Sequence, residues 1–117
     1  ELMPGLVLLV TQEGLGHVGS AEKQFGLEMF DHFLHALESQ AIKPRAICFY
    51  TDGVKLVCDG SSAVLGLRIL QELGVRLVAC RTCLDHFRLT DKQVVGEVGG
   101  MNDIVGLLTD ADSVVTV

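Results

Sequence analysis

The sequence predicts an α/β fold: a three-layer α/β/α sandwich around a mainly parallel five-stranded sheet. Two observations predict it. Short apolar runs alternate along the chain with segments of helical periodicity, and this alternation is typical of parallel strands joined by crossover helices. The length of 117 residues is also that of a chain able to bury one full core. We therefore expect residues 1–117 to form a single domain.

Five apolar runs are expected to form the strands. They are bounded by glycine, proline or polar residues, as buried strands commonly are. In chain order they are residues 6–10, 46–50, 75–80, 94–95 and 113–117. Asp52 and Gly53 also offer a hairpin turn, which would pair residues 54–57 with the second strand. We prefer an irregular loop that leads into the next helix.

Three segments have the periodicity of helices with one buried face. Their apolar positions run from Gly26 to Leu37, from Gly66 to Leu73 and from Met101 to Leu108. In such a sheet, ligands bind at the carboxyl ends of the strands. The loops at residues 12–19, 51–53 and 80–83 should therefore converge at that edge.

Composition excludes several function classes. The net charge is −6 and no basic cluster is present, so nucleic-acid binding is not expected. No apolar run approaches the length of a membrane span, and no signal-peptide pattern is visible. Four cysteines in a core-rich chain suggest a reducing compartment, so we expect a cytoplasmic protein.

The most informative stretch places Cys80 and Cys83, spaced C-x-x-C, where the third strand meets a helix. Thr82 and Asp85 match a capping pattern that would put Cys83 at the first helical position. Free amides and the helix dipole favour an anion there, and Arg81 adds a positive charge. We therefore expect the pKa of Cys83 to fall below its ordinary value of about 8.5, giving a reactive thiolate.

Other interpretations of these cysteines stay open. Cys80 ends an apolar strand and fits a buried structural cysteine as well as a functional one. His86 lies three residues beyond Cys83, where it would promote ionisation of the thiol or simply face solvent. A thioredoxin-like dithiol is less favoured because no Trp or Pro flanks the pair. We expect no metal, since zinc needs four ligands and one cysteine pair is visible, and we read Cys48 as core.

A glycine-rich loop follows the first strand. Its sequence matches G-x-G-x-x-G, although its first glycine comes too late after the strand for a dinucleotide site. We expect no cofactor here, but a loop that admits a small anion or other ligand near the following helix start. The residues concerned are Gly14, Gly16, Gly19 and Ser20.

Three stretches carry a resemblance to a known family: residues 80–85 (Cys-Arg-Thr-Cys-Leu-Asp), 89–92 (Leu-Thr-Asp-Lys) and 95–96 (Val-Gly). They resemble the C-terminal domain of the YedF proteins, within the DsrE-like superfamily. These proteins are described as sulfurtransferase-like and are linked to selenium metabolism. The resemblance covers residues 6–117. One departure is Arg81, which stands where the family usually has glycine.

The resemblance implies a DsrE-like sandwich and a persulfide relay, carrying sulfur or selenium. Cys83 and Cys80 would be catalytic. From their positions beside Cys83, and independently of the resemblance, we expect Arg81, Thr82 and His86 to stabilise the thiolate. The implied partners are a sulfur donor or acceptor protein, such as a TusA-like domain, and further copies of the chain in a homo-oligomer. The TusA-like N-terminal domain of the family has no counterpart in these residues. The alternative is a non-catalytic ligand-binding or assembly module with structural cysteines.

Overall fold

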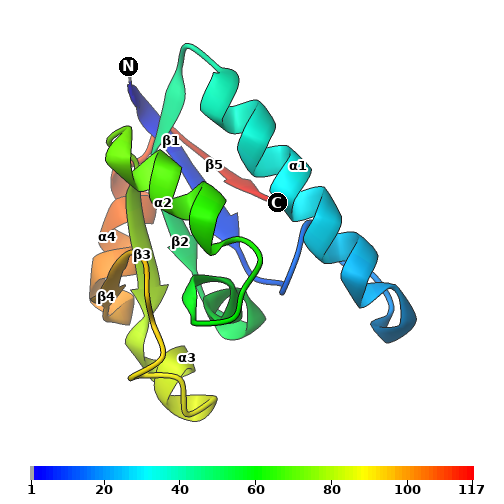
Figure 1. The fold of residues 1–117 in the computed structure, drawn as a ribbon. Coiled ribbons are helices and arrows are strands. Elements are labelled where there is room, and N and C mark those ends of the chain that lie inside the picture. Colours follow the sequence, from blue (N-terminus) through cyan, green and yellow to red (C-terminus); the bar gives the residue numbers. More distant parts are fainter. Residues whose placement is uncertain (1) are drawn as a thin grey trace.

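The computed structural model describes residues 2–117, with side chains from residue 5 onward (Figure 1). Nine helices and strands follow one another along this part of the chain, with two 3-10 helices, η1 and η2, among them. In chain order they are β1 (Leu2–Val10), η1 (Ser20–Glu22), α1 (Lys23–Ser39), β2 (Lys43–Phe49), η2 (Thr51–Val57), α2 (Val64–Glu72), β3 (Arg76–Cys80), α3 (Arg81–His86), β4 (Glu97–Gly99), α4 (Met101–Asp110) and β5 (Ser113–Thr116).

The five strands form one parallel sheet in the order β4-β3-β2-β1-β5, which confirms the predicted fold class. The register brings the carboxyl ends of the central strands level with one another. Val10 pairs with Phe49, and Phe49 pairs with Ala79. The residues that follow these three strands therefore meet at one edge of the sheet.

The strand order also decides which helix covers which face. From β1 to β3 the chain moves across the sheet in one direction, so right-handed crossovers place α1 and α2 on the same face. From β4 the chain returns to β5 on the far edge, which places α4 on the opposite face. Figure 1 shows α1 and α2 in front of the sheet with α4 behind it. The sheet is thus the middle of three layers.

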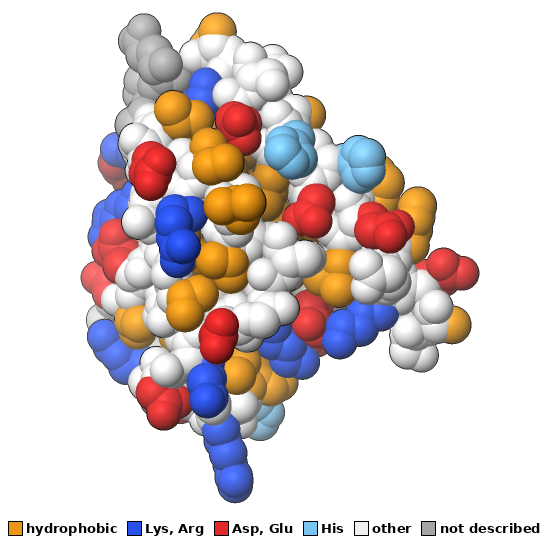
Figure 2. All heavy atoms as spheres, viewed as in Figure 1, with side chains coloured by type: hydrophobic (Ala, Val, Ile, Leu, Met, Phe, Trp, Pro, Cys, Tyr) orange, Lys and Arg blue, Asp and Glu red, His pale blue; other side chains and the backbone are white. Residues whose placement is uncertain are grey.

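The core is apolar and lies between these layers. Phe30 and Leu34 of α1, Leu67 of α2 and Ile104 of α4 are all almost fully buried. The outer strand β5 is exposed along its length, whereas β2 and β3 end in four consecutive buried residues. In Figure 2 the surface over α1 and α2 shows hydrophobic side chains interspersed with charged ones. No helix within residues 2–117 is both long and apolar enough to cross a membrane.

One predicted strand is wrong. Residues 94–95 lie outside the parallel sheet, and the fourth strand is β4, which begins two residues later. The Val94 N–H instead donates a hydrogen bond to the Val57 carbonyl over 2.9 Å, beside an antiparallel bridge between Gln93 and Cys58. Gly96 then turns the chain with φ +80°, a conformation that suits glycine, before β4 joins β3.

The segment after β2 forms the 3-10 helix η2 rather than a hairpin. Asp52 and Gly53 lie inside this helix, and residues 54–57 do not pair with β2. The preferred interpretation, an irregular link into α2, is closer to the structure. The helix matters because it carries Thr51 to the carboxyl edge of the sheet.

Candidate functional site

Cys83 lies in the first turn of α3, at the carboxyl edge of the sheet. β3 runs directly into α3, so Cys80, the last strand residue, is the helix N-cap, and Cys83 is the third helical residue. The prediction that Thr82 caps the helix is therefore wrong. Thr82 is the second helical residue, and the Asp85 carboxylate accepts a hydrogen bond from the Thr90 hydroxyl instead. The last residue of β3 is also the N-cap residue of α3, because no loop separates the strand from the helix.

The Cys83 thiol is held by a backbone amide from another strand end. The Thr51 N–H donates a hydrogen bond to Cys83 Sγ over 3.1 Å. The Thr51 hydroxyl lies 2.9 Å from the Thr11 carbonyl oxygen and 2.7 Å from that of Tyr50. Thr51 thus connects the residues that follow β1, β2 and β3, as the predicted convergence of loops requires.

A close backbone approach fixes the position of η2 over β1. A Cβ on Gly53 would lie 2.1 Å from the Val10 carbonyl oxygen, so only glycine fits there. The same carbonyl accepts a hydrogen bond from the Tyr50 N–H over 3.1 Å. Thr51 itself has φ +51°, a left-handed conformation that a β-branched residue rarely adopts. These contacts together set the direction of the Thr51 amide.

The pKa of Cys83 is raised above its ordinary value, so the predicted lowering is wrong. Burial is the largest cause, followed by a side-chain hydrogen bond with Cys80, while the Thr51 N–H acts in the opposite direction. The Arg81 guanidinium lies near α4, with Nη1 3.6 Å from where a Cβ on Gly100 would be. The His86 ring packs edge-on against Phe87 with centroids 5.0 Å apart. The group that favours the thiolate is therefore a backbone amide, which sequence reasoning had no means of finding.

The other three cysteines are buried. Cys80 is 1% exposed and belongs to the core. Cys48 is fully buried in β2, where burial raises its pKa to about 11, so its assignment to the core is confirmed. Cys58 is also buried, its thiol donates a hydrogen bond to the Val54 carbonyl over 3.3 Å, and burial raises its pKa. Among the four, Cys83 is the accessible thiol.

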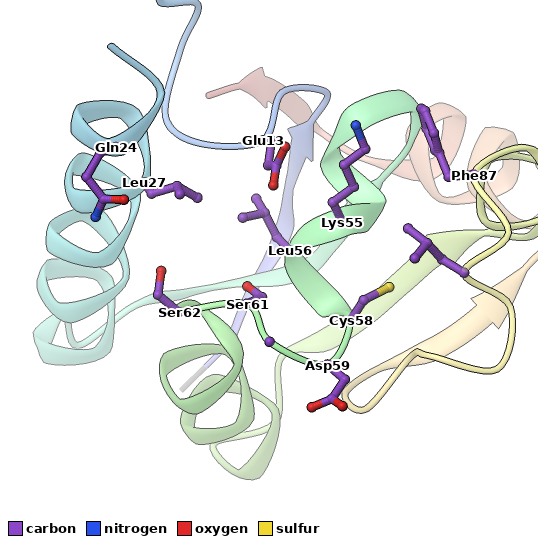
Figure 3. A pocket seen from close by; sticks show the side chains of 12 residues that line it. Glu13, Gln24, Leu27, Lys55, Leu56, Cys58, Asp59, Ser61, Ser62 and Phe87 are labelled. Carbon is purple, nitrogen blue, oxygen red and sulfur yellow. The ribbon is translucent and has the colours of Figure 1, made fainter. Parts of the chain in front are cut away.

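A cavity of about 510 Å³ opens beside η2 (Figure 3). The sequence gives no sign of this cavity, because its walls come from four segments that are far apart in the chain. Lys55 lies at its rim, with Nζ 2.8 Å from Asp52 Oδ1 and 4.4 Å from the centre of the Phe87 ring. The cavity is lined by Glu13, Gln24, Leu27, Lys55, Leu56, Cys58, Asp59, Gly60, Ser61, Ser62, Phe87 and Leu89.

The glycine-rich loop lines a second, open cavity of about 170 Å³. All four predicted loop residues line it, namely Gly14, Gly16, Gly19 and Ser20. Lys23 and Lys55 face it together with Glu13 and Asp52, so charges of both signs are present. One glycine has a packing role, because a Cβ on Gly14 would lie 2.8 Å from the carbonyl carbon of Gly26 in α1.

Comparison with solved structures supports the fold. The ychN protein from E. coli matches with a TM-score of 0.67 at 18% identity, covering 98% of this chain and 100% of that protein. MTH1491 from Methanobacterium thermoautotrophicum, a protein of unknown function, matches with a TM-score of 0.64, also at 18% identity, covering 96% and 97%. The comparison with curated proteins finds no match.

The family assignment comes from sequence. A model of the DsrE/DsrF-like family matches residues 19–117, which include η2 and both cysteines of the C-x-x-C pair. This match covers most of the chain. The protein therefore belongs to the DsrE/DsrF-like family, which is associated with sulfur relay.

Proposed function

We propose that this domain is a sulfur carrier in which Cys83 accepts a sulfane sulfur as a persulfide and passes it to an acceptor thiol. The observation that carries the proposal is the accessible Cys83 thiol at the carboxyl edge of the sheet, accepting the Thr51 N–H over 3.1 Å. Ligands of open α/β sheets approach at this edge. The family association with sulfur relay supports the same chemistry.

The reaction needs a deprotonated Cys83. Its thiolate attacks the outer sulfur of a donor persulfide, a new S–S bond forms on Cys83, and the donor leaves as a thiolate. Transfer to the acceptor repeats this exchange with the acceptor thiolate as nucleophile. The Thr51 N–H stabilises negative charge on Cys83 Sγ at both steps. The raised pKa reduces the thiolate fraction but makes each thiolate a stronger nucleophile, with a Brønsted coefficient of about 0.4–0.5.

The resemblance to YedF proteins gives the proposal its finer content. The Cys80-Arg-Thr-Cys83-Leu-Asp85 core supports membership of that group, and with it a role in sulfur or selenium metabolism. A TusA-like domain is then the proposed partner of Cys83. We also propose a homo-oligomer, and the exposed Val114 and Val115 on the edge strand β5 offer apolar surface for it.

The test uses two cysteine variants treated with inorganic polysulfide. Cys83→Ser removes the acceptor thiol, whereas Cys48→Ala removes a thiol that is buried in β2. Intact mass measured on protein alkylated at once after loading should show one added, reducible sulfur on the wild type and on Cys48→Ala and none on Cys83→Ser. Circular dichroism checks that both variants fold. Equal loading of Cys83→Ser would contradict the proposal.

The 510 Å³ cavity favours one alternative, a ligand-binding module with structural cysteines. Its volume falls within the range of small-molecule sites, about 300–1,000 Å³, and it combines apolar walls with a few polar groups. In that case no cysteine variant would change sulfur loading, because none of the thiols would carry sulfur. A ligand screen by thermal shift, repeated with Leu56→Trp to fill the cavity, would then identify the occupant.

A further inference from the structure

We propose that Cys80 resolves a persulfide on Cys83, so that the domain releases its sulfur as hydrogen sulfide and ends as a Cys80–Cys83 disulfide. This inference rests on the proposed function and deepens it. It gives the carrier a second outcome besides transfer to an acceptor thiol. It is based on the positions of the two cysteines at the junction of β3 and α3.

The helix start brings the two side chains together. Cys80 is the N-cap of α3 and Cys83 is its third residue, the two positions whose side chains meet in a capping box. Cys80 is also one of the neighbours that raise the pKa of the Cys83 thiol. Residues three apart on a helix have Cβ atoms about 5–6 Å apart, and a disulfide needs roughly 3.8 Å. Cys80 has extended backbone angles, φ −67° and ψ 122°, so the Cβ spacing of two helical residues does not limit this pair.

Burial sets the order of events. Cys80 is 1% exposed, so a sulfur donor in solution does not reach it directly. Cys83 is partly exposed and receives the sulfur first. The persulfide that forms has its inner sulfur beside the Cys80 thiol. Cys80 therefore reacts with sulfur already bound to the domain.

The resolving step balances without an external oxidant. The Cys80 thiolate attacks the inner sulfur of the Cys83 persulfide and forms the Cys80–Cys83 bond. The bond to the outer sulfur breaks, and its electron pair leaves with that sulfur as hydrosulfide, which takes up the proton given up by Cys80. The sulfane sulfur is reduced to sulfide and the cysteine pair is oxidised. A dithiol reductant, such as dithiothreitol in vitro, then restores both thiols.

The Thr51 amide also serves this cycle. A dithiol reductant reaches the disulfide at the partly exposed Cys83 and displaces Cys80. Its second thiol then attacks the reductant sulfur of the mixed disulfide, and Cys83 leaves as a thiolate. A leaving thiolate departs faster when its charge is stabilised, and the Thr51 N–H lies 3.1 Å from that sulfur. The same hydrogen bond thus supports loading of Cys83 and regeneration of the pair.

The test follows sulfide after loading. Wild type, Cys80→Ser and Cys48→Ala are treated with inorganic polysulfide and freed of it by gel filtration, and released sulfide is trapped with monobromobimane. Wild type and Cys48→Ala should release sulfide and lose two hydrogens relative to the reduced chain. Cys80→Ser should keep its added sulfur and release sulfide at least about tenfold more slowly. Cys80→Ala provides a second variant in case the buried hydroxyl of serine disturbs the fold.

Three outcomes separate the possibilities. Sulfide release from both Cys80 variants at the wild-type rate would overturn the role of Cys80 and leave the carrier function intact. No added sulfur on either Cys80 variant, in which the persulfide has no resolving thiol, would overturn both proposals. Diamide oxidation tests the pair without any sulfur donor: it should protect Cys80 and Cys83 from alkylation after unfolding, and two free thiols at these positions would contradict the pairing.

Discussion

The backbone N–H of Thr51 donates a hydrogen bond to Cys83 Sγ over 3.1 Å, although 32 residues separate the two in the chain. The bond joins the end of β2 to the first turn of α3. It depends on η2, whose close contact with β1 at Gly53 fixes the position of Thr51. The environment of the reactive thiol is therefore set by backbone packing at the edge of the sheet.

Gly53→Ala tests this packing. The added Cβ would lie 2.1 Å from the Val10 carbonyl oxygen, so η2 must shift. We expect the free energy of unfolding to fall by about 1–3 kcal/mol. The rate of Cys83 alkylation should change as well, because the Thr51 amide moves. Urea denaturation and iodoacetamide kinetics measure the two effects.

Gly106→Ala is the matched control. Gly106 lies within α4, and a Cβ there would meet no atom within 4 Å apart from its chain neighbours and the backbone of its own helix. Alanine should raise stability by roughly 0.5–1 kcal/mol, because glycine inside a helix is unfavourable. Cys83 alkylation should stay unchanged. Equal free energies of unfolding for Gly53→Ala and Gly106→Ala would contradict the claim that the close contact at Gly53 fixes the position of η2.

The alkylation of Cys83 should depend on pH in a way that reflects its raised pKa. The rate follows the thiolate fraction, so it should be low at neutral pH and still rise at pH values where an ordinary cysteine is already largely ionised. The measurement is iodoacetamide labelling of native protein from pH 6 to 10, mapped to each cysteine. A plateau already reached near neutral pH would show a lowered pKa and contradict the structure.

Protein stability should fall at high pH through Cys48. Its pKa is about 11 in the folded protein and 9.0 for the ordinary group, so the folded state binds more protons between these values. The stabilisation is present below pH 9.0 and is lost as pH rises through about 11. Cys48→Ala should show a smaller decline in unfolding midpoint over this window. An equal decline in both proteins would assign the effect to other groups.

The ion pair between Arg76 of β3 and Glu97 of β4 should contribute little to the stability of the folded protein. Its two hydrogen bonds measure 3.0 and 2.9 Å, but both side chains are about half exposed. We expect Glu97→Gln to cost about 0.2–1 kcal/mol. Arg76 lowers the pKa of Glu97, so the small contribution is present above the ordinary carboxyl pKa and is lost on acidification through the lower folded value. Urea denaturation of the wild type and Glu97→Gln at pH 7 and pH 3 measures this contribution. A loss of more than about 2 kcal/mol in the free energy of unfolding would contradict the small contribution expected for this ion pair.

The sequence predicted the layers well because strand–helix alternation and apolar runs determine them. It misplaced the fourth strand because β4 is a short edge strand with two exposed residues, while the more apolar residues 94–95 pack against η2 instead. Short edge strands carry little hydrophobic signal. The link at 51–57 was ambiguous for a similar reason, since Asp52-Gly53 suits a turn as well as a 3-10 helix.

The candidate site was predicted in part. The C-x-x-C spacing and the strand end located Cys83, but the capping pattern misplaced the helix start, because Cys80 serves as both strand end and cap. The expected lowering of the pKa considered the helix start and Arg81 and left out burial and the neighbouring thiol. The Thr51 amide and the large cavity arise from tertiary contacts, which leave no pattern in the sequence.

The most direct measurement maps the position of a bound sulfur. Wild-type protein is loaded with inorganic polysulfide, alkylated at once, digested and analysed by mass spectrometry. The carrier function predicts an alkylated persulfide on the peptide containing Cys83, removed by dithiothreitol, while Cys48 and Cys58 carry none. A sulfur found on Cys58 or Cys48 with none on Cys83, or no persulfide on any cysteine, would contradict the proposed function.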